Sequence, residues 1–188
     1  MATPDIGACV SSGVAGFKKD PVKHVVVSLL MGLVGGFSGG LLYGPMMVGY
    51  MRMIKTEEEG GTTQIGDIFK GFDDFVPALL AVLLSTIAVS IGIVLCIIPG
   101  LLIMGLIPLA AYLVAVGEKD GIAALKRAWE IIKDNLVASC LCTLVLSIIG
   151  SLGAILCGIG IVLTMPIAFI GLYHMAKQLA SGSASATA

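Results

Sequence analysis

Few side chains in this chain have the chemistry for catalysis or metal binding, and their spacing does not assemble a site. The two histidines, His24 and His174, lie far apart in the sequence, and a zinc site built on them would need further ligands that the sequence does not place nearby. We interpret both as polar residues at a membrane surface. The acidic run Glu57–Glu59 is typical of a solvated loop, with a cation site as the alternative. The sequence therefore predicts no catalytic residue, no metal site, no cofactor and no enzyme activity.

The cysteines follow no metal-binding or redox spacing, because no two of them form a CxxC pair. Cys140 and Cys142 are two residues apart, so on a helix they point to different sides. We interpret the cysteines as small apolar residues, since free cysteine is readily buried. Cys96 and Cys157 fall at matching places in two predicted hairpins, and whether they pair in an oxidising compartment stays open.

The composition is that of a membrane protein. Of the 188 residues, 57% are hydrophobic and only 12% are charged, whereas soluble domains carry about 25% charged residues. A bilayer can solvate such a surface and water cannot. The net charge of −1 gives no basic field for nucleic acid, so the predicted partner is the lipid bilayer.

All the Asp, Glu, Lys and Arg residues lie outside three windows, His24–Met51, Phe75–Gly117 and Asn135–Ala176, of 28, 43 and 42 residues. Each longer window has room for two helices of about 21 residues, roughly 32 Å long, which matches a bilayer core. Breakers near the middle of each window favour hairpins. These breakers are Pro99 and Gly100 in one window and Gly158 and Gly160 in the other.

The first window is shorter and allows two interpretations. Two helices there would be about 26 Å each, with a turn at the glycine-rich residues 35–40. The alternative is one long tilted helix, because glycines recur every fourth residue and would let another helix approach closely. These glycines are Gly32, Gly36, Gly40 and Gly44. We favour the hairpin, and both interpretations of residues 22–54 stay open.

Three hairpins place every charged residue on one side of the membrane, and the excess of Lys and Arg in short loops identifies that side as cytoplasmic. The sequence therefore predicts a multi-pass protein of the cell (cytoplasmic or inner) membrane with both termini in the cytoplasm.

A short amphipathic segment precedes each window and ends in an acidic residue: Asp20, Asp74 or Asp134. Phe17, Phe72 and Trp129 are the predicted interfacial anchors of these segments, which either pack on the bundle or lie among the lipid headgroups. The expected fold is an all-α bundle of about six transmembrane helices, arranged as three hairpins. It forms one domain over residues 1–179, with repeats at 5–55, 63–117 and 120–179, followed by a disordered tail at 180–188.

A distinctive run of motifs covers roughly residues 65–175. Ile98-Pro99-Gly100 is followed by Ile107-Pro108-Leu109-Ala110 and then by Ala124-Leu125-Lys126-Arg127-Ala128-Trp129-Glu130. This run resembles the membrane domain attached to some glycerophosphodiester phosphodiesterases and the related YciC-like prokaryotic membrane proteins. The resemblance implies the fold and no phosphodiesterase activity, because the hydrolase domain is absent.

No charged residue or proton relay lies inside the windows, which argues against ion-coupled transport. Gly, Ala and Ser spaced for close helix contact remain, namely the glycines of residues 32–44 together with Ser147 and Gly150. Our leading hypothesis is a structural or assembly protein that forms homo-oligomers and shapes or organises the membrane. The alternatives are a passive channel or carrier for a neutral or lipidic substrate, and an accessory subunit of another membrane protein.

Overall fold

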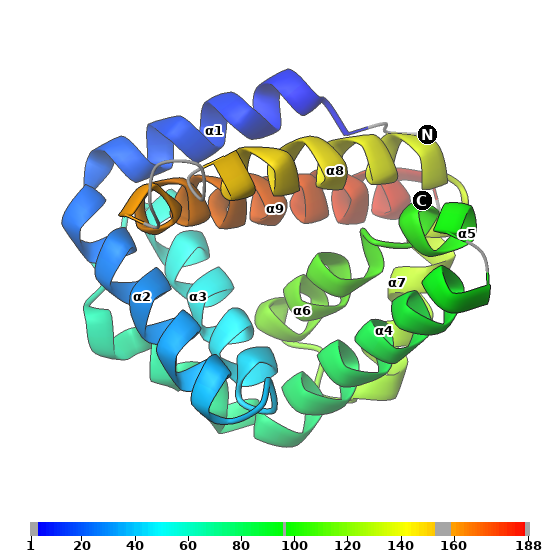
Figure 1. The fold of residues 1–188 in the computed structure, drawn as a ribbon, viewed down its shortest axis with the longest axis horizontal. Coiled ribbons are helices and arrows are strands. Elements are labelled where there is room, and N and C mark those ends of the chain that lie inside the picture. Colours follow the sequence, from blue (N-terminus) through cyan, green and yellow to red (C-terminus); the bar gives the residue numbers. More distant parts are fainter. Residues whose placement is uncertain (1–3, 96, 153–158, 187–188) are drawn as a thin grey trace.

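The computed structural model describes residues 4–95, 97–152 and 159–186, and the secondary structure in these ranges is entirely helical. Figure 1 shows the arrangement. The helices in chain order are α1 (Ile6–Lys19), α2 (Pro21–Phe37), α3 (Tyr43–Glu58), the 3₁₀ helix η1 (Ile65–Asp74), α4 (Phe75–Leu95), α5 (Ile97–Leu102), α6 (Leu106–Val116), α7 (Gly121–Lys133), α8 (Leu136–Leu152) and α9 (Ile159–Ala186).

Acidic side chains set several helix starts. The carboxylate of Asp5 accepts a hydrogen bond from the Ala8 amide, and that of Asp120 accepts one from the Ile122 amide, at 3.0 and 2.9 Å. Asp20 accepts from the Lys23 amide at 3.3 Å and precedes Pro21, the first residue of α2. These contacts satisfy amides that have no partner inside the helix, and proline is well suited to the first position. The Asp-Pro pair therefore ends α1 and starts α2.

The amphipathic segments pack on the arms of other hairpins. Helix α1 packs on α9, η1 packs on α3, and α7 packs on α6. Within the hairpins, α2 contacts α3, α4 contacts α6, and α8 contacts α9. Figure 1 shows α3 and α6 toward the middle, with α2, α4 and α8 around them. The chain thus closes on itself, because its first helix covers its last.

Two glycine pairs allow the closest of these crossings. A Cβ on Gly71 of η1 would lie 2.5 Å from the Gly49 amide nitrogen and would fall on the Pro45 carbonyl oxygen. A Cβ on Gly13 of α1 would lie 2.6 Å from the Ile167 carbonyl oxygen and 3.4 Å from the Gly171 nitrogen. Only glycine permits backbones to approach this closely. The core around these crossings is made mostly of methionine, aliphatic and tyrosine side chains, the largest being Tyr50, Tyr173, Met31, Met46, Met51, Met53, Ile68, Leu109, Ile132, Leu146, Ile170 and Met175.

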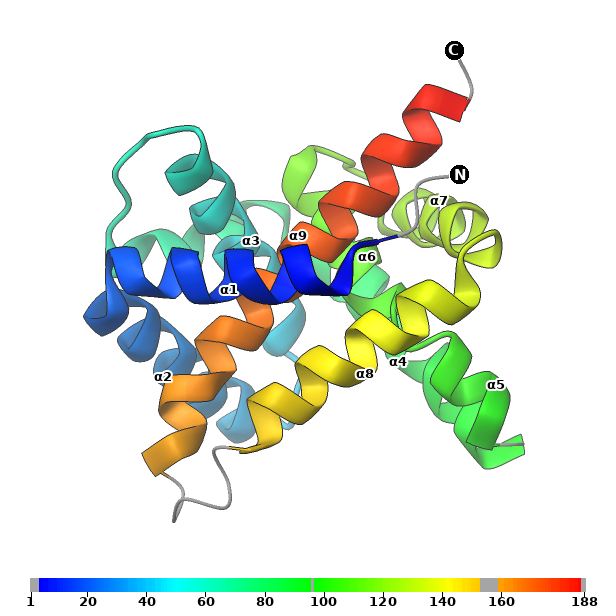
Figure 2. The same cartoon turned by 90° about the horizontal axis from the view of Figure 1, so that it is seen from above.

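The structure has helices that are long and apolar enough to cross a membrane, namely Ile65–Leu95 and Ile97–Val116 in the described part of the chain. Up to four crossings result if two bent pairs each count as one, so the prediction of six transmembrane helices is not confirmed. In these pairs α1 meets α2 at 106° and α7 meets α8 at 105°. Figure 2 shows α1 lying across the molecule while α2 descends from its end. In contrast, η1 and α4 form one continuous helical span, Ile65–Leu95.

The first window contains two helices and a turn, which rules out one long helix in the structure. Gly39 and Gly40 have φ values of +61° and +88°, a left-handed conformation that glycine adopts without strain. The turn lies at residues 38–42, slightly later than predicted.

The other breakers lie in places that differ from the expectation. Pro99 and Gly100 are within the short helix α5 rather than in a turn. Gly100 lies where α5 folds back on α4, and a Cβ added to Gly92 would be 2.9 Å from Cα of Gly100. Proline is tolerated there because it is in the first turn of the helix. Gly160 is in the first turn of α9, and Gly158 lies outside the described residues, as do Cys96 and Cys157. The predicted disordered tail is helical as far as Ala186.

Candidate functional site: a partly buried charge cluster and an apolar cavity

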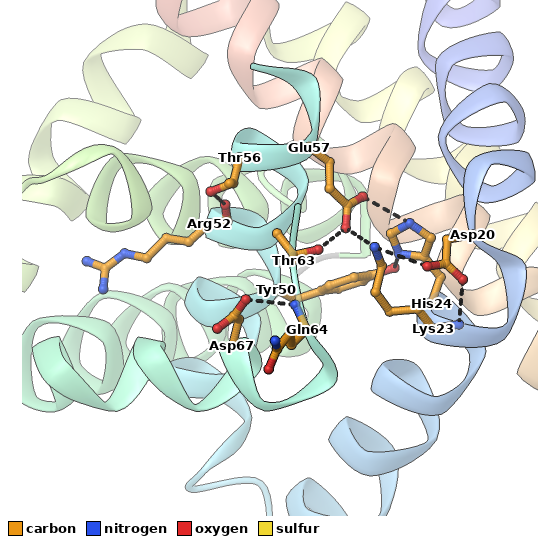
Figure 3. Close-up of polar contacts among 10 residues, drawn as sticks. All are labelled: Asp20, Lys23, His24, Tyr50, Arg52, Thr56, Glu57, Thr63, Gln64 and Asp67. Carbon is orange, nitrogen blue, oxygen red and sulfur yellow. Dashed lines mark hydrogen bonds and ion pairs between the residues drawn. The ribbon is translucent and has the colours of Figure 1, made fainter. Parts of the chain in front are cut away.

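The main polar cluster of the structure gathers on Glu57, in the last turn of α3. Nζ of Lys23 lies 2.8 Å from Oε1 of Glu57, and the Thr63 hydroxyl also contacts that oxygen. Nε2 of His24 lies 3.2 Å from Oε2, close enough for an ion pair but not aligned for a hydrogen bond. Lys23 is held in addition by Asp20, at 3.4 Å. Figure 3 shows these side chains converging on the carboxylate.

His24 is fully buried and packs against Tyr50 as well as Glu57. Nδ1 lies 3.1 Å from the Tyr50 hydroxyl, in a hydrogen bond whose direction depends on the tautomer. The interpretation of His24 as a residue at the membrane surface was therefore wrong. Both ring nitrogens face protein groups, so the ring ties α2 to α3 and has no nitrogen directed at a substrate.

The charge of Glu57 is stabilised by its neighbours. Burial alone would raise the pKa of Glu57, but the adjacent His24, Lys23 and Thr63 side chains outweigh burial and lower the pKa to about 2. A carboxylate in this setting is ionised throughout the physiological range. The cluster therefore acts as an electrostatic clamp between the two arms of the first hairpin.

The neighbouring Glu58 makes a second clamp, between α3 and α9. Nζ of Lys177 lies 2.6 Å from its Oε1, the Tyr173 hydroxyl donates to its Oε2 at 3.0 Å, and Nδ1 of His174 lies 4.0 Å from Oε1. A hollow of about 180 Å³ between the two clamps is lined by His24, Glu57, Glu58, His174 and residues of α1. Glu57 and Glu58 are thus helical and paired rather than part of a solvated loop, whereas Glu59 lies in the turn after α3 and is exposed.

Arg52, one turn before the acidic run, joins α3 to two further segments. Its guanidinium donates to the carbonyl oxygens of Lys70 at 3.0 Å, Ala115 at 3.3 Å and Val114 at 3.4 Å, and also binds Asp74. Figure 3 shows Arg52 pointing away from Glu57. The C-terminal half of α3 is therefore the polar centre of the molecule. Beyond it, Asp67 accepts a hydrogen bond from the Gln64 amide at 2.8 Å, which fixes the start of η1.

A large apolar cavity lies among α3, α4, α6, α8 and α9. Its volume is about 520 Å³, and the residues lining it are aliphatic, aromatic, glycine, proline or hydroxyl-bearing. The hydroxyls of Thr86 and Thr143 are already bonded, to the Val82 carbonyl oxygen at 2.7 Å and to Sδ of Met175 at 3.3 Å. Helix α3 thus carries the polar clamp at its C-terminal end and lines the apolar cavity at its N-terminal end.

The residues predicted as helix contacts divide into two groups. Gly44 packs on α4, where its Cβ would lie 2.9 Å from the Ala78 carbonyl oxygen, and Gly150 packs on Ala168 of α9. Gly32, Gly36 and Gly40 have no atom within 4 Å of an added Cβ, so they make no close helix crossing within the described chain. Ser147 lines the apolar cavity.

The predicted interfacial anchors also differ from one another. Trp129 of α7 is 46% exposed, whereas Phe17 is half-buried against the core and Phe72 stacks on Phe75 with ring centroids 6.1 Å apart. Phe69 of η1 is exposed to a similar extent as Trp129 and was missed. The amphipathic period pointed to the right segments, but it could not tell which apolar residues face the bundle.

The clamps were missed because their partners are far apart in the sequence. One signal was available. A hairpin with arms of equal length brings the start of its first helix next to the end of its second helix. This places Lys23 and His24 opposite Glu57 and Glu58. Comparisons with protein-family models, with curated proteins and with solved structures gave no match to this chain.

Proposed function

We propose that this chain is a structural membrane protein that organises the bilayer around it and associates with copies of itself. The observation that carries the proposal is the right-angle bend between each terminal amphipathic helix and the apolar helix that follows, 106° at α1–α2 and 105° at α7–α8. If α2 and α8 enter the membrane, α1 and α7 lie along its surface. In this proposal the membrane is the cell membrane and the termini are in the cytoplasm, as the distribution of Lys and Arg predicts.

Helix α7 has the features of a helix that rests in a membrane surface. Ala124 and Ala128 are buried against the bundle, while Lys126 and Arg127 are exposed. Ile122 and Trp129 form an additional exposed apolar stripe, seven residues apart. Amphipathic helices with cationic and aromatic residues bind at the boundary between headgroups and acyl chains. Their insertion into one leaflet would widen that leaflet and favour curvature.

Self-association is supported by the outer face of α2. Gly32 and Gly36 have open space around them, and Leu29, Leu33 and Phe37 are exposed along the same helix. Small residues on an apolar face let a helix of a second copy approach closely in a bilayer. The resemblance to the YciC-like families is compatible with this role and rests on the sequence motifs alone.

A carrier of a lipidic substrate is the second candidate function, favoured by the apolar cavity of about 520 Å³. A polar channel has less support. Ser85, Thr86 and Ser151 donate to backbone oxygens of their own helices at 2.6–2.8 Å, so these hydroxyls are not free to line a water path.

The proposal predicts that the purified chain forms oligomers and changes the shape of vesicles. Reconstitution into vesicles of phosphatidylcholine and phosphatidylglycerol, imaged by electron cryomicroscopy, should show smaller or tubular vesicles. Mass photometry in mild detergent should show more than one chain per particle. The double variant Ile122→Ser/Trp129→Ser should deform vesicles less, because serine removes the apolar stripe of α7.

The matched control is Ile122→Leu/Trp129→Phe, which keeps the stripe apolar and should behave like the unmodified chain. A monomeric protein that leaves vesicle shape unchanged would contradict the proposal.

A further inference from the structure

The apolar cavity is elongated along α4. Six residues of this helix line it at spacings of one, three or four, from Leu79 to Ile93. The fourteen steps between these two residues correspond to about 21 Å of helix. The opposite wall comes from Met47 of α3, Met104 and Ile107 near α6, and Ser147 of α8. The hollow is therefore a slot rather than a compact pocket.

The slot offers few polar groups, and it is open along α4, where Leu83, Thr86 and Ile93 are exposed. The described residues that line it include no charged side chain, and the hydroxyls of Thr86 and Thr143 already donate to protein atoms. An ordered water needs two to four polar partners, and besides the two bonded threonines only Tyr43 and Ser147 bring hydroxyls to the lining. An empty hollow of this size would leave its walls without contacts, which is costly. An apolar occupant would restore those contacts.

We propose that this slot binds one acyl chain of a membrane lipid, in an extended conformation. Hydrocarbon chains are the apolar molecules that a membrane protein meets at the highest concentration. The hydrocarbon core of a bilayer is about 30 Å thick, so one leaflet contributes chains of about 15 Å, which the slot accommodates lengthwise. The absence of charge from the described lining places the lipid headgroup outside. This inference does not depend on the proposed effect on membrane shape.

The slot shares two of its lining residues with a neighbouring hollow. A second apolar hollow of about 200 Å³ lies between α2 and α9, beside Leu29 and Leu33, which are exposed on the outer face. Tyr43 and Phe169 line both the hollow and the slot, with their ring centroids 6.4 Å apart. These two rings form the partition through which an acyl chain would enter from the side.

The test uses phosphatidylcholine that carries a diazirine on its acyl chain, mixed into vesicles that hold the full-length protein. After illumination, mass spectrometry maps the labelled residues. Met47 reports on the slot, because it lines the slot and is only 3% exposed, so bulk lipid does not reach it otherwise. We expect Met47 to be labelled in the unmodified chain. An unlabelled Met47 would overturn the proposal whatever the variants do.

The double variant Thr86→Phe/Ser147→Phe fills the slot from two sides and should lower labelling of Met47 several-fold. The control Ile87→Phe/Ile148→Phe places the same two phenylalanine side chains at the adjacent exposed positions, outside the residues lining the slot. It should leave Met47 labelling unchanged. Circular dichroism checks that each variant is folded. Labelling of Met47 that persists equally in a folded slot-filling variant would also contradict an acyl chain in the slot.

Discussion

Replacement of Gly71 by alanine is expected to unfold the chain about 10 °C earlier, because a methyl group at this position has no space. Its Cβ would fall on the Pro45 carbonyl oxygen and lie 2.9 Å from Cα of Gly49. These are backbone atoms of α3, which cannot move aside as a flexible side chain would. Overpacking of this kind costs up to about 3 kcal/mol or more, and in a chain of this length 1 kcal/mol corresponds to roughly 2–4 °C.

The consequence extends beyond the crossing. If η1 is pushed off α3, Arg52 loses its hydrogen bond to the Lys70 carbonyl oxygen and its contact with Asp74. The guanidinium would then be only partly satisfied in a half-buried place, and that loss adds to the steric one. Gly71→Ala should therefore lower the melting temperature in detergent and separate η1 from the bundle.

Gly66→Ala is the matched control, because Gly66 lies in the same 3₁₀ helix and has no atom within 4 Å of an added Cβ. It should change the free energy of unfolding by no more than about 0.5 kcal/mol, as is usual for surface positions. Equal melting temperatures for Gly71→Ala and the unmodified chain, followed by circular dichroism, would show that η1 does not sit on α3 as described.

Replacement of Glu57 by glutamine is expected to destabilise the chain at neutral pH and to remove part of its acid sensitivity. The pKa of Glu57 is lowered from 4.5 to about 2 in the folded chain. A carboxyl group with a lowered pKa stabilises the fold above its ordinary pKa, and that stability is lost as the pH falls toward the folded value. The contribution of Glu57 should thus be complete above pH 4.5 and should disappear progressively between pH 4.5 and pH 2.

The size of the effect at pH 7 is on the order of 2 kcal/mol, since one pKa unit corresponds to about 1.4 kcal/mol and the residue keeps some access to solvent. Glutamine would also leave Lys23 and His24 facing a neutral amide. Chemical denaturation from pH 7 to pH 3 should show the difference between the two chains shrinking as the pH falls.

The control is Glu59→Gln, at the exposed end of the same acidic run. It should change the free energy of unfolding at pH 7 by no more than about 0.5 kcal/mol, as is usual for surface positions. Other acidic groups, including Glu58, titrate in both proteins and cancel in the comparison. A stability difference for Glu57→Gln that stays constant from pH 7 to pH 3 would contradict the clamp.

Local patterns predicted the helical class, the amphipathic segments and the first hairpin. They did so because helix periodicity, Asp-Pro and glycine turns are short-range signals. The close crossings could not be predicted in this way. Gly49 meets Gly71, and Gly13 meets Gly171, although these residues are far apart in the sequence. The regularly spaced glycines at 32, 36 and 40 were predicted to make close helix contacts, but they face open space. Repetition along one helix does not reveal which backbone comes near it.

The charged residues show the same limit. Spacing assigned His24 to the membrane surface because it follows Lys23 at the edge of an apolar window, and the fold buries it against Tyr50 and Glu57. The predicted six membrane crossings are also not confirmed. A window without charged residues shows only how long an apolar segment is. The right-angle bends at the ends of α1 and α7 decide how much of each segment can enter the bilayer.

The claim that the amphipathic helices lie along the membrane surface can be tested most directly through Trp129, the only tryptophan in the chain. Its fluorescence in vesicles can be quenched by lipids brominated either near the headgroup or near the end of the acyl chain. Aromatic residues of interfacial helices reside at the headgroup boundary. We predict strong quenching by the shallow bromine and weak quenching by the deep one. Stronger quenching by the deep bromine, or none by either, would contradict a surface position for α7.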